Sequence, residues 1–226
     1  MSTYHLKTYY KQFIADTITP VSVYLKIRDV FPNSILLESS DYHANDNSFS
    51  YICCNPLASI KVENNEITQQ FPDATTTISL IENNNVAEII HQFTQQFQAE
   101  TQENFKFITN GIFGYTAYDA VKYFEDVDIN QKPNSISIPD MYYAVYQNII
   151  AINHHKNEAY IFANCYQNDN NIDYIFQLIT SQNYSSFNFK TTQDIETNLT
   201  DEDFKSQVEL AKKHCQRGDV FQLVLS

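Results

Sequence analysis

The fold is decided at Ile35-Leu36-Leu37-Glu38-Ser39, a short apolar stretch that ends on an acid and a hydroxyl. Ten residues further on, the sequence Phe49-Ser50-Tyr51-Ile52-Cys53-Cys54-Asn55-Pro56 predicts a second strand that returns beside the first. This pair of strands places the Glu38 carboxylate and the Ser39 hydroxyl at the rim of an apolar pocket. Such a pocket suits a free amino acid, because it offers an apolar wall and a few fixed polar groups.

Further strands extend this pair into an antiparallel sheet. Runs of alternating apolar residues are separated by the turn residues Asn64-Asn65 and Pro72-Asp73, and by the exposed turn around His154-His155. Neighbouring residues of a strand or turn point apart, so this histidine pair does not indicate a metal site. The predicted strands are Ser34–Glu38, Phe49–Cys54, Ala58–Val62, Glu66–Gln70, Thr76–Leu80, Tyr142–Asn153 and Glu158–Cys165.

Three helices have clear signals in the sequence. Thr19-Pro20 is typical of a helix start, with Thr as the N-cap and Pro at the first helical position. Apolar residues at helical spacing from Val86 to Phe97 predict a second helix. The third is capped by Thr200 and ends at Gly218, and the alternation that follows from Val220 predicts the start of another strand.

The chain has only three glycines, so each is expected where the backbone requires it. Gly111-x-x-Gly114 lacks the third glycine of a dinucleotide-binding loop. This pair therefore indicates close backbone packing or a tight turn, at the end of a strand that leads into a helix.

Composition excludes several classes of function. The net charge of −13 and the absence of a basic cluster argue against nucleic-acid binding. The sequence shows neither a signal peptide nor an apolar run long enough to cross a membrane. The cysteines Cys53, Cys54, Cys165 and Cys215 form no C-x-x-C pair, so we expect reduced core thiols in a cytoplasmic protein.

Polar stretches at 167–171 and 181–198 indicate a domain boundary. We therefore expect an N-terminal domain over residues 1–198. Residues 199–226 would begin a second domain that is cut short.

Taken in order, several segments resemble the N-terminal part of anthranilate synthase component I, the chorismate-using subunit of tryptophan biosynthesis. The Leu-Leu-Glu-Ser segment favours this family over relatives that make aminodeoxychorismate or isochorismate. The matching segments are Thr19–Leu25, Leu36–Ser39, Phe49–Ile52, Gly111–Tyr115, Tyr118-Asp119, Pro139-Asp140 and Gly218–Ser226.

The resemblance implies an α+β fold, with antiparallel sheets packed face to face and flanking helices. It implies that Glu38 and Ser39 line a pocket for tryptophan, the feedback inhibitor, with Leu37, Phe49 and Ser50 as further candidates. Indole would fill the apolar side and Glu38 would meet the α-ammonium group. In this reading residues 1–198 are a regulatory domain and 199–226 the truncated start of the catalytic domain.

The chemistry implied by the resemblance is the conversion of chorismate and ammonia to anthranilate and pyruvate. A glutamine amidotransferase subunit supplies the ammonia, and Mg²⁺ held by paired Glu residues binds the substrate carboxylate. The resemblance places these Glu residues and the general base beyond the position of Ser226. We therefore expect no catalytic residue and no metal ligand in this chain, and no activity from it alone.

Two alternatives remain open at this stage. One is a stand-alone amino-acid-binding module without catalysis, which calorimetric titration with tryptophan would distinguish. The other is a related chorismate enzyme, aminodeoxychorismate or isochorismate synthase, which would differ in the active-site half.

Overall fold

The computed structural model describes residues 3–38, 48–81, 85–100, 105–127, 129, 138–167, 169–181, 190 and 197–225. The chain divides into two compact units, Met1–Ser185 and Ser186–Ser226. The sequence-based domain bounds of 1–198 and 199–226 stay a prediction.

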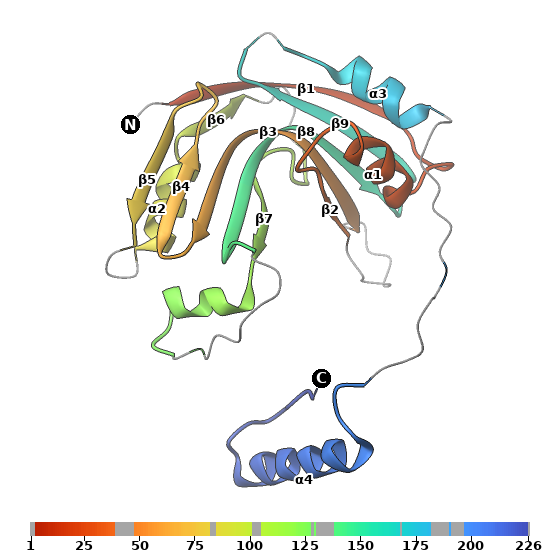
Figure 1. The fold of residues 1–226 in the computed structure, drawn as a ribbon. Coiled ribbons are helices and arrows are strands. Elements are labelled where there is room, and N and C mark those ends of the chain that lie inside the picture. The colour runs from red at the N-terminus through yellow and green to blue at the C-terminus, as the bar shows by residue number, and fades with distance from the viewer. Residues whose placement is uncertain are drawn as a thin grey trace. The chain divides into compact units, whose positions relative to one another are not determined.

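The larger unit is built on one sheet of nine described strands, which Figure 1 shows as a curved layer. The strands follow the order β5-β4-β3-β8-β9-β1-β6, with β2 beside β3 and β7 beside β8. Neighbours are antiparallel except β1 and β6, which are parallel. The strands are β1 (Tyr4–Ile14), β2 (Ile35–Leu37), β3 (Phe49–Glu63), β4 (Glu66–Gln70), β5 (Thr76–Leu80), β6 (Phe97–Glu100), β7 (Ile112–Thr116), β8 (Met141–Asn153) and β9 (Glu158–Cys165).

β3 is one long strand where the sequence predicted two, Phe49–Cys54 and Ala58–Val62. The register with β8 shifts between Pro56 and Ala58, and Asn55 adopts a positive φ of 59°. Leu57, directly after Pro56, is the residue without a register partner at this shift. A bulge is one of the few places where a strand accommodates a proline, which cannot donate a ladder hydrogen bond. The bulge therefore lets β3 continue and bend instead of ending.

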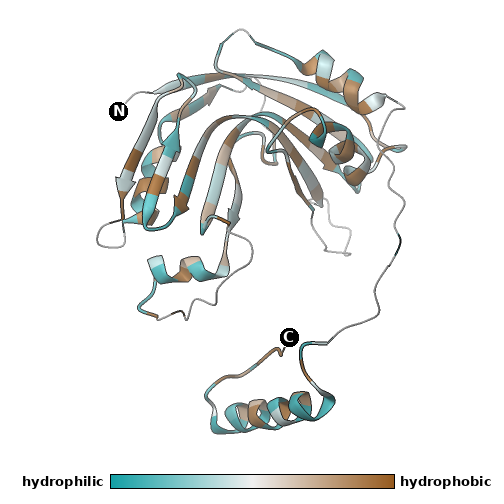
Figure 2. Ribbon diagram, viewed as in Figure 1, coloured by the Kyte–Doolittle hydropathy of each residue, from teal (hydrophilic) through white to brown (hydrophobic). Residues whose placement is uncertain are grey.

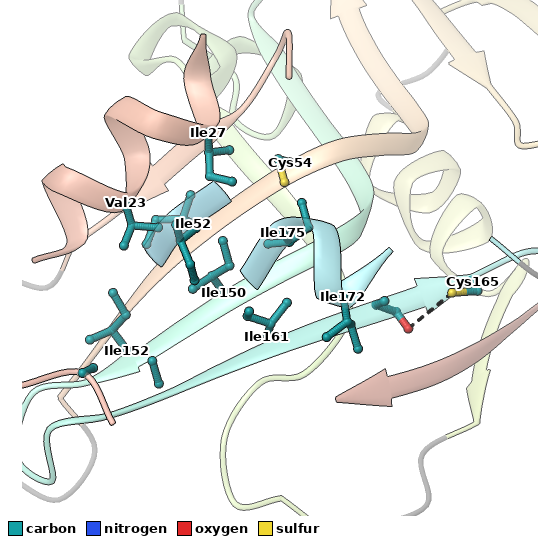
Figure 3. Close-up of a cluster of buried hydrophobic side chains, with 14 residues drawn as sticks. Val23, Ile27, Ile52, Cys54, Ile150, Ile152, Ile161, Cys165, Ile172 and Ile175 are labelled. Carbon is teal, nitrogen blue, oxygen red and sulfur yellow. Dashed lines mark hydrogen bonds between the residues drawn. The ribbon is translucent and has the colours of Figure 1, made fainter. Parts of the chain in front are cut away.

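Two helices cover one face of the sheet: α1 (Pro20–Arg28) and α3 (Ile172–Thr180). α1 begins as predicted, because the Thr19 hydroxyl accepts from the Ser22 amide and the Ser22 hydroxyl accepts from the Thr19 amide. Figure 3 shows the buried side chains between these helices and the strands. The dashed line marks the hydrogen bond that the Cys165 thiol donates to the Ala163 carbonyl oxygen. The labelled residues are Val23, Ile27, Ile52, Cys54, Ile150, Ile152, Ile161, Cys165, Ile172 and Ile175.

A second core lies under α2 (Val86–Thr94) and joins distant parts of the sheet. Leu6 of β1 packs in the same cluster as Ile60 of β3 and Ile67 of β4. Tyr4 stacks on Phe71, and its hydroxyl donates to the Asp73 carboxylate at 3.1 Å. The two ends of the sheet therefore meet. The predicted α+β class is confirmed: the described strands form one large, mostly antiparallel sheet, accompanied by a few helices.

The helix predicted up to Phe97 ends earlier, at Thr94, and Phe97 begins β6. Three elements were not predicted: the strands β1 and β6 and the helix α3. The segment after β7 forms a 3₁₀ helix, η1 (Tyr118–Tyr123). No helix among the described residues is long and apolar enough to cross a membrane.

The smaller unit contains α4 (Asp201–Arg217), which the sequence predicted with its caps. The Asp203 amide donates to the Thr200 hydroxyl, and Gly218 adopts the left-handed conformation with φ 81°. The strand predicted from Val220 is wrong for the described residues, because 219–225 have no neighbouring strand to pair with. Phe221 is 99% exposed there.

Gly114 in β7 lies where no side chain fits. A Cβ built on it would come within 1.9 Å of the Tyr142 carbonyl oxygen in the neighbouring strand β8. Close backbone packing was one of the two readings of the Gly111-x-x-Gly114 pair, and for Gly114 it is confirmed.

We therefore expect Gly114→Ala to lower the free energy of unfolding by about 3 kcal/mol, since the added methyl must displace backbone rather than a flexible side chain. Urea denaturation followed by circular dichroism measures this change. The exposed Lys106→Ala variant is the control and should shift the free energy by less than about 0.5 kcal/mol. Equal midpoints for Gly114→Ala and the parent chain would contradict the clash.

Candidate functional site

The strands β2 and β3 pair antiparallel. Leu37 pairs with Tyr51, Leu36 with Ile52 and Ile35 with Cys53. Paired residues share a face of the sheet and alternate along each strand. Leu36 accordingly packs into the core under α1 and α3, while Leu37 packs on the opposite face.

The face that carries Leu37 is lined with aromatic rings. Phe49 stacks on Phe107 with ring centroids 4.6 Å apart, and Phe107 lies 5.1 Å from Tyr160. Phe105 packs edge-on against Phe162 at 5.1 Å. Leu37 and most of these rings are only partly buried, so the face offers apolar surface that a flat aromatic ligand can stack on.

The tyrosine hydroxyls of this face remain protonated at neutral pH. Burial, followed by the hydrogen bond to Glu158, raises the pKa of Tyr160 to about 12. Burial also raises the pKa of Tyr51. The rings therefore supply stacking surface and neutral hydroxyls rather than a counter-charge.

Glu38 is the first residue after β2 and is exposed. It lies next to Leu37, so its carboxylate is attached at the margin of the aromatic face. No hydrogen bond or ion pair joins it to another residue within the part of the chain that the structure describes. Ser39, the second polar candidate, lies outside the described residues.

Ser50 lies on the other side of the sheet from its neighbour Phe49. It is 1% exposed, and its hydroxyl is 2.7 Å from Nε2 of His154, which belongs to the exposed turn after β8. A single pocket on the aromatic face can therefore take Leu37 and Phe49 but not Ser50. Period-two alternation is the physical reason.

Three aromatic residues that were not predicted as site residues lie on the same face as Phe49: Phe105, Phe107 and Tyr160. The alternation Phe105-x-Phe107 and Tyr160-x-Phe162 is a signal for one shared face. The sequence alone, however, does not show that residues 105–107 lie against β3 and β9.

The turn that leads into β2 is held by tyrosine hydroxyls. Tyr146, which is fully buried, donates to the Asn33 carbonyl at 3.0 Å, and Tyr24 donates to the Ser34 carbonyl at 3.4 Å. Asn33 has a positive φ of 60°, which asparagine tolerates better than most residues. These bonds fix where β2 begins and hence where Glu38 emerges.

We expect Tyr146→Phe to lower the free energy of unfolding by about 1 kcal/mol, because it leaves the Asn33 carbonyl without this donor. Urea denaturation measures the loss. Tyr174→Phe is a matched control, since the Tyr174 ring is half exposed and its contact with Phe31 is retained. A Tyr146→Phe variant as stable as the control would show that the hydroxyl does not hold the turn.

The three core thiols stay protonated at neutral pH. Burial raises the pKa of Cys54 to about 12 and that of Cys165 to about 11, and it also raises the pKa of Cys53. A thiol must ionise to react. Cys53, Cys54 and Cys165 are free core thiols as predicted, whereas Cys215 is exposed.

The donor set for a metal ion is missing from the described part of the chain. No group of three or more His, Cys, Asp or Glu side chains lies close enough together there to hold one. The described residues therefore do not fit a Mg²⁺ site.

Comparison with known proteins places the chain among enzymes that bind chorismate. The family described as chorismate binding enzyme matches residues 33–226. The chain is 30% identical to anthranilate synthase component 1 of Lactococcus lactis over 229 residues, covering 96% of this chain and 47% of the relative. With the protein of the same name from Aquifex aeolicus it shares 25% identity, covering 99% of this chain and 47% of the relative.

A solved structure has a similar fold, that of anthranilate synthase component I from Streptococcus pneumoniae TIGR4. The TM-score is 0.50 at 18% identity, and the match covers 92% of this chain and 46% of that chain. The chain thus spans about half the length of the curated relatives it matches.

Proposed function

This chain belongs to the chorismate binding enzyme family, and from that membership we propose that it forms the N-terminal half of an anthranilate synthase component I. The observation that carries the proposal is the similarity to relatives of this name along almost the whole chain. In the proposed complete enzyme, chorismate and ammonia give anthranilate and pyruvate. A glutamine amidotransferase partner supplies the ammonia.

In this proposal the N-terminal half has a regulatory role and the remaining half carries out catalysis. Its described residues offer no metal-binding cluster, and its core thiols are held protonated by burial. The proposal therefore assigns the Mg²⁺ ligands and the general base to the remaining half. Mg²⁺ would there neutralise the substrate carboxylate.

The regulatory ligand in this proposal is tryptophan, bound at the end of β2. The aromatic face around Phe49 and Phe107, with Leu37 at its margin, would take the indole by stacking. Glu38 would bind the α-ammonium group, as a charge-assisted hydrogen bond to a carboxylate is the strong way to hold an amine. Ser39 would hydrogen-bond a polar group of the ligand.

We expect no anthranilate from this chain alone when it is incubated with chorismate, ammonium ion and Mg²⁺. The reason is that the proposed metal ligands and general base lie in the other half. Anthranilate fluorescence measures the product sensitively, and a complete anthranilate synthase component 1 from Lactococcus lactis is the positive control. Measurable product from the chain alone would contradict the proposed division.

Tryptophan binding is testable directly, because the chain contains no Trp and the ligand's own indole emission reports binding. With only part of the pocket present, we expect a dissociation constant of about 1 mM or weaker. Glu38→Gln should raise this dissociation constant by a further factor of about ten, because the charge-assisted hydrogen bond to the ammonium group is lost. Phe49→Ala should also raise the dissociation constant, because it removes the ring on which the indole stacks.

Ser50→Ala is the matched control for this titration. It removes a polar group next to Phe49 in sequence, but on the other face of the sheet, and so it should leave the affinity unchanged. Equal affinities for Glu38→Gln and the parent chain would remove Glu38 from the pocket. Micromolar binding by the unmodified chain would instead favour a stand-alone amino-acid-binding module.

A further inference from the structure

A concave site lies beside α1, on the face of the sheet that α1 and α3 cover (Figure 1). Its volume is about 510 Å³, which lies within the roughly 300–1,000 Å³ of small-molecule sites. The end of β1, the turn that follows it, one side of α1 and the last turn of α3 line the site. The aromatic face around Phe49 contributes no residue, so this site is separate from the proposed tryptophan pocket.

Apolar side chains form half of the lining, and part of that apolar surface faces solvent. Ile14 is 74% exposed and Val21 is 48% exposed. Figure 2 shows hydrophobic residues in brown and hydrophilic residues in teal on α1 and α3. Of the twelve lining residues five carry hydroxyl groups, one is Lys26, and six are apolar: Phe13, Ile14, Ile18, Val21, Leu25 and Ile179.

Lys26 is the only charged residue of the lining. It is partly buried, and its ammonium group donates a hydrogen bond to the Ile179 carbonyl oxygen at 2.6 Å. Burial lowers the pKa of Lys26, because the charged form loses contact with water. An anion beside this ammonium group would compensate for the lost water.

The other partly buried lysines in the described part of the chain already have such an anion. Lys11 forms an ion pair with Asp173, Lys61 with Glu63 and Lys122 with Asp140, each with N···O distances of 2.9 or 3.0 Å. Lys26 forms an ion pair with no residue that the structure describes. It is therefore the exception among lysines of similar burial.

Capping of α3 accounts for only part of the Lys26 ammonium group. The bond to the Ile179 carbonyl is a C-terminal helix cap, and it uses one of three N–H groups. The preceding carbonyl, that of Leu178, already accepts from the amide and the hydroxyl of Ser181. The remaining N–H groups of Lys26 are thus left for a ligand.

The dimensions of the site set the size of that ligand. The site extends along α1 from Thr19 to Lys26, which is about two turns or roughly 10 Å. A carboxylate bound at Lys26 therefore leaves room for an apolar body along Leu25 and Ile18.

We propose that this site binds a monocarboxylate with a compact apolar body, whose carboxylate pairs with Lys26 and whose body packs on Ile18 and Leu25. One cation without a neighbouring acid selects a single negative charge. A second carboxylate would lie among apolar side chains without a counter-charge. A free amino acid is disfavoured as well, because its ammonium group would lie close to Lys26.

Amide chemical shifts of the labelled chain, titrated with sodium hydrocinnamate, test the site directly. This probe has a phenyl ring, a short chain and one carboxylate. We expect a dissociation constant of about 1 mM, as for a small ligand with one charged contact. The shift changes should centre on Thr17, Leu25 and Ser181 rather than on Glu38 and Phe49.

Two further probes separate the charge from the apolar body. Hydrocinnamyl alcohol keeps the body and lacks the charge, whereas acetate keeps the charge and lacks the body. Each should have a dissociation constant about ten-fold higher than hydrocinnamate. Equal constants for the acid and the alcohol would overturn the proposal, as would shift changes centred on Glu38. The absence of shift changes well above the expected constant would overturn it too.

Lys26→Met should remove the preference for the acid over the alcohol, and Lys26→Arg should retain it. Because Lys26 also caps α3, circular dichroism of both variants checks that the helices remain. A preference that persists in Lys26→Met would overturn the role of this ammonium group.

Val21→Glu tests the site without touching Lys26. It places a carboxylate in the lining at the first turn of α1, where an acid is favourable for the helix. It should raise the dissociation constant of hydrocinnamate by about five-fold through charge repulsion. Val127→Glu is the matched control, since Val127 is 47% exposed and lies outside the site. Equal effects of the two substitutions would overturn the proposal. Hydrocinnamate carries no ammonium group for Glu38, so this outcome is independent of tryptophan binding.

Discussion

The antiparallel pairing of β3 with β8 runs from Phe49 opposite Asn153 to Val62 opposite Met141, and the larger unit is organised around it. The first part of β3 pairs with β2 on its other side and the second part with β4. Likewise, β8 pairs with β9 along one part of its length and with β7 along the other. Two long strands therefore belong to both halves of the sheet, and the bulge at Pro56 lets them bend between the halves.

This constraint fixes the candidate site. Because β3 is locked to β8 over its length, the face of each residue is set: Phe49 joins the rings of Phe107 and Tyr160, while Ser50 lies beneath His154. A slip of one residue would exchange the two faces. It would move Ile52 and Cys54 out of the core under α1 and α3, so packing against those helices holds the aromatic face in place.

Local signals predicted part of this arrangement from sequence. Asn64-Asn65 marks a tight turn, and both residues adopt positive φ values, which is why β4 was predicted with its correct bounds. Thr19 and Gly218 identified helix ends because capping is a property of a few neighbouring residues. Gly114 was predicted to need close packing, and the Tyr142 carbonyl is the group that it meets.

What depends on distant partners was not predicted. The predicted break between Phe49–Cys54 and Ala58–Val62 was wrong, because only pairing with β8 shows that a bulge joins the two segments. The rings of Phe105 and Phe107 were not connected with Phe49, because they reach it only through the folded chain. Val220 was read as a strand start from its alternation, but alternation makes a strand only where a neighbour supplies hydrogen bonds.

The two units differ in what their exposed apolar residues mean. Ile78 and Leu80 belong to a sheet whose hydrophobic clusters do not include them, so their exposure does not reflect an incomplete core.

In α4, by contrast, no described residue is buried, and Phe204 and Leu210 are 45% and 56% exposed. An isolated helix gains little beyond its caps, since most helical stability in proteins comes from packing one apolar face. Thr200, Gly218 and the ion pair of Arg217 with Asp219 are thus the interactions that define α4 within its own unit. The stability of that unit therefore rests on local capping, whereas the stability of the larger one rests on long-range strand pairing.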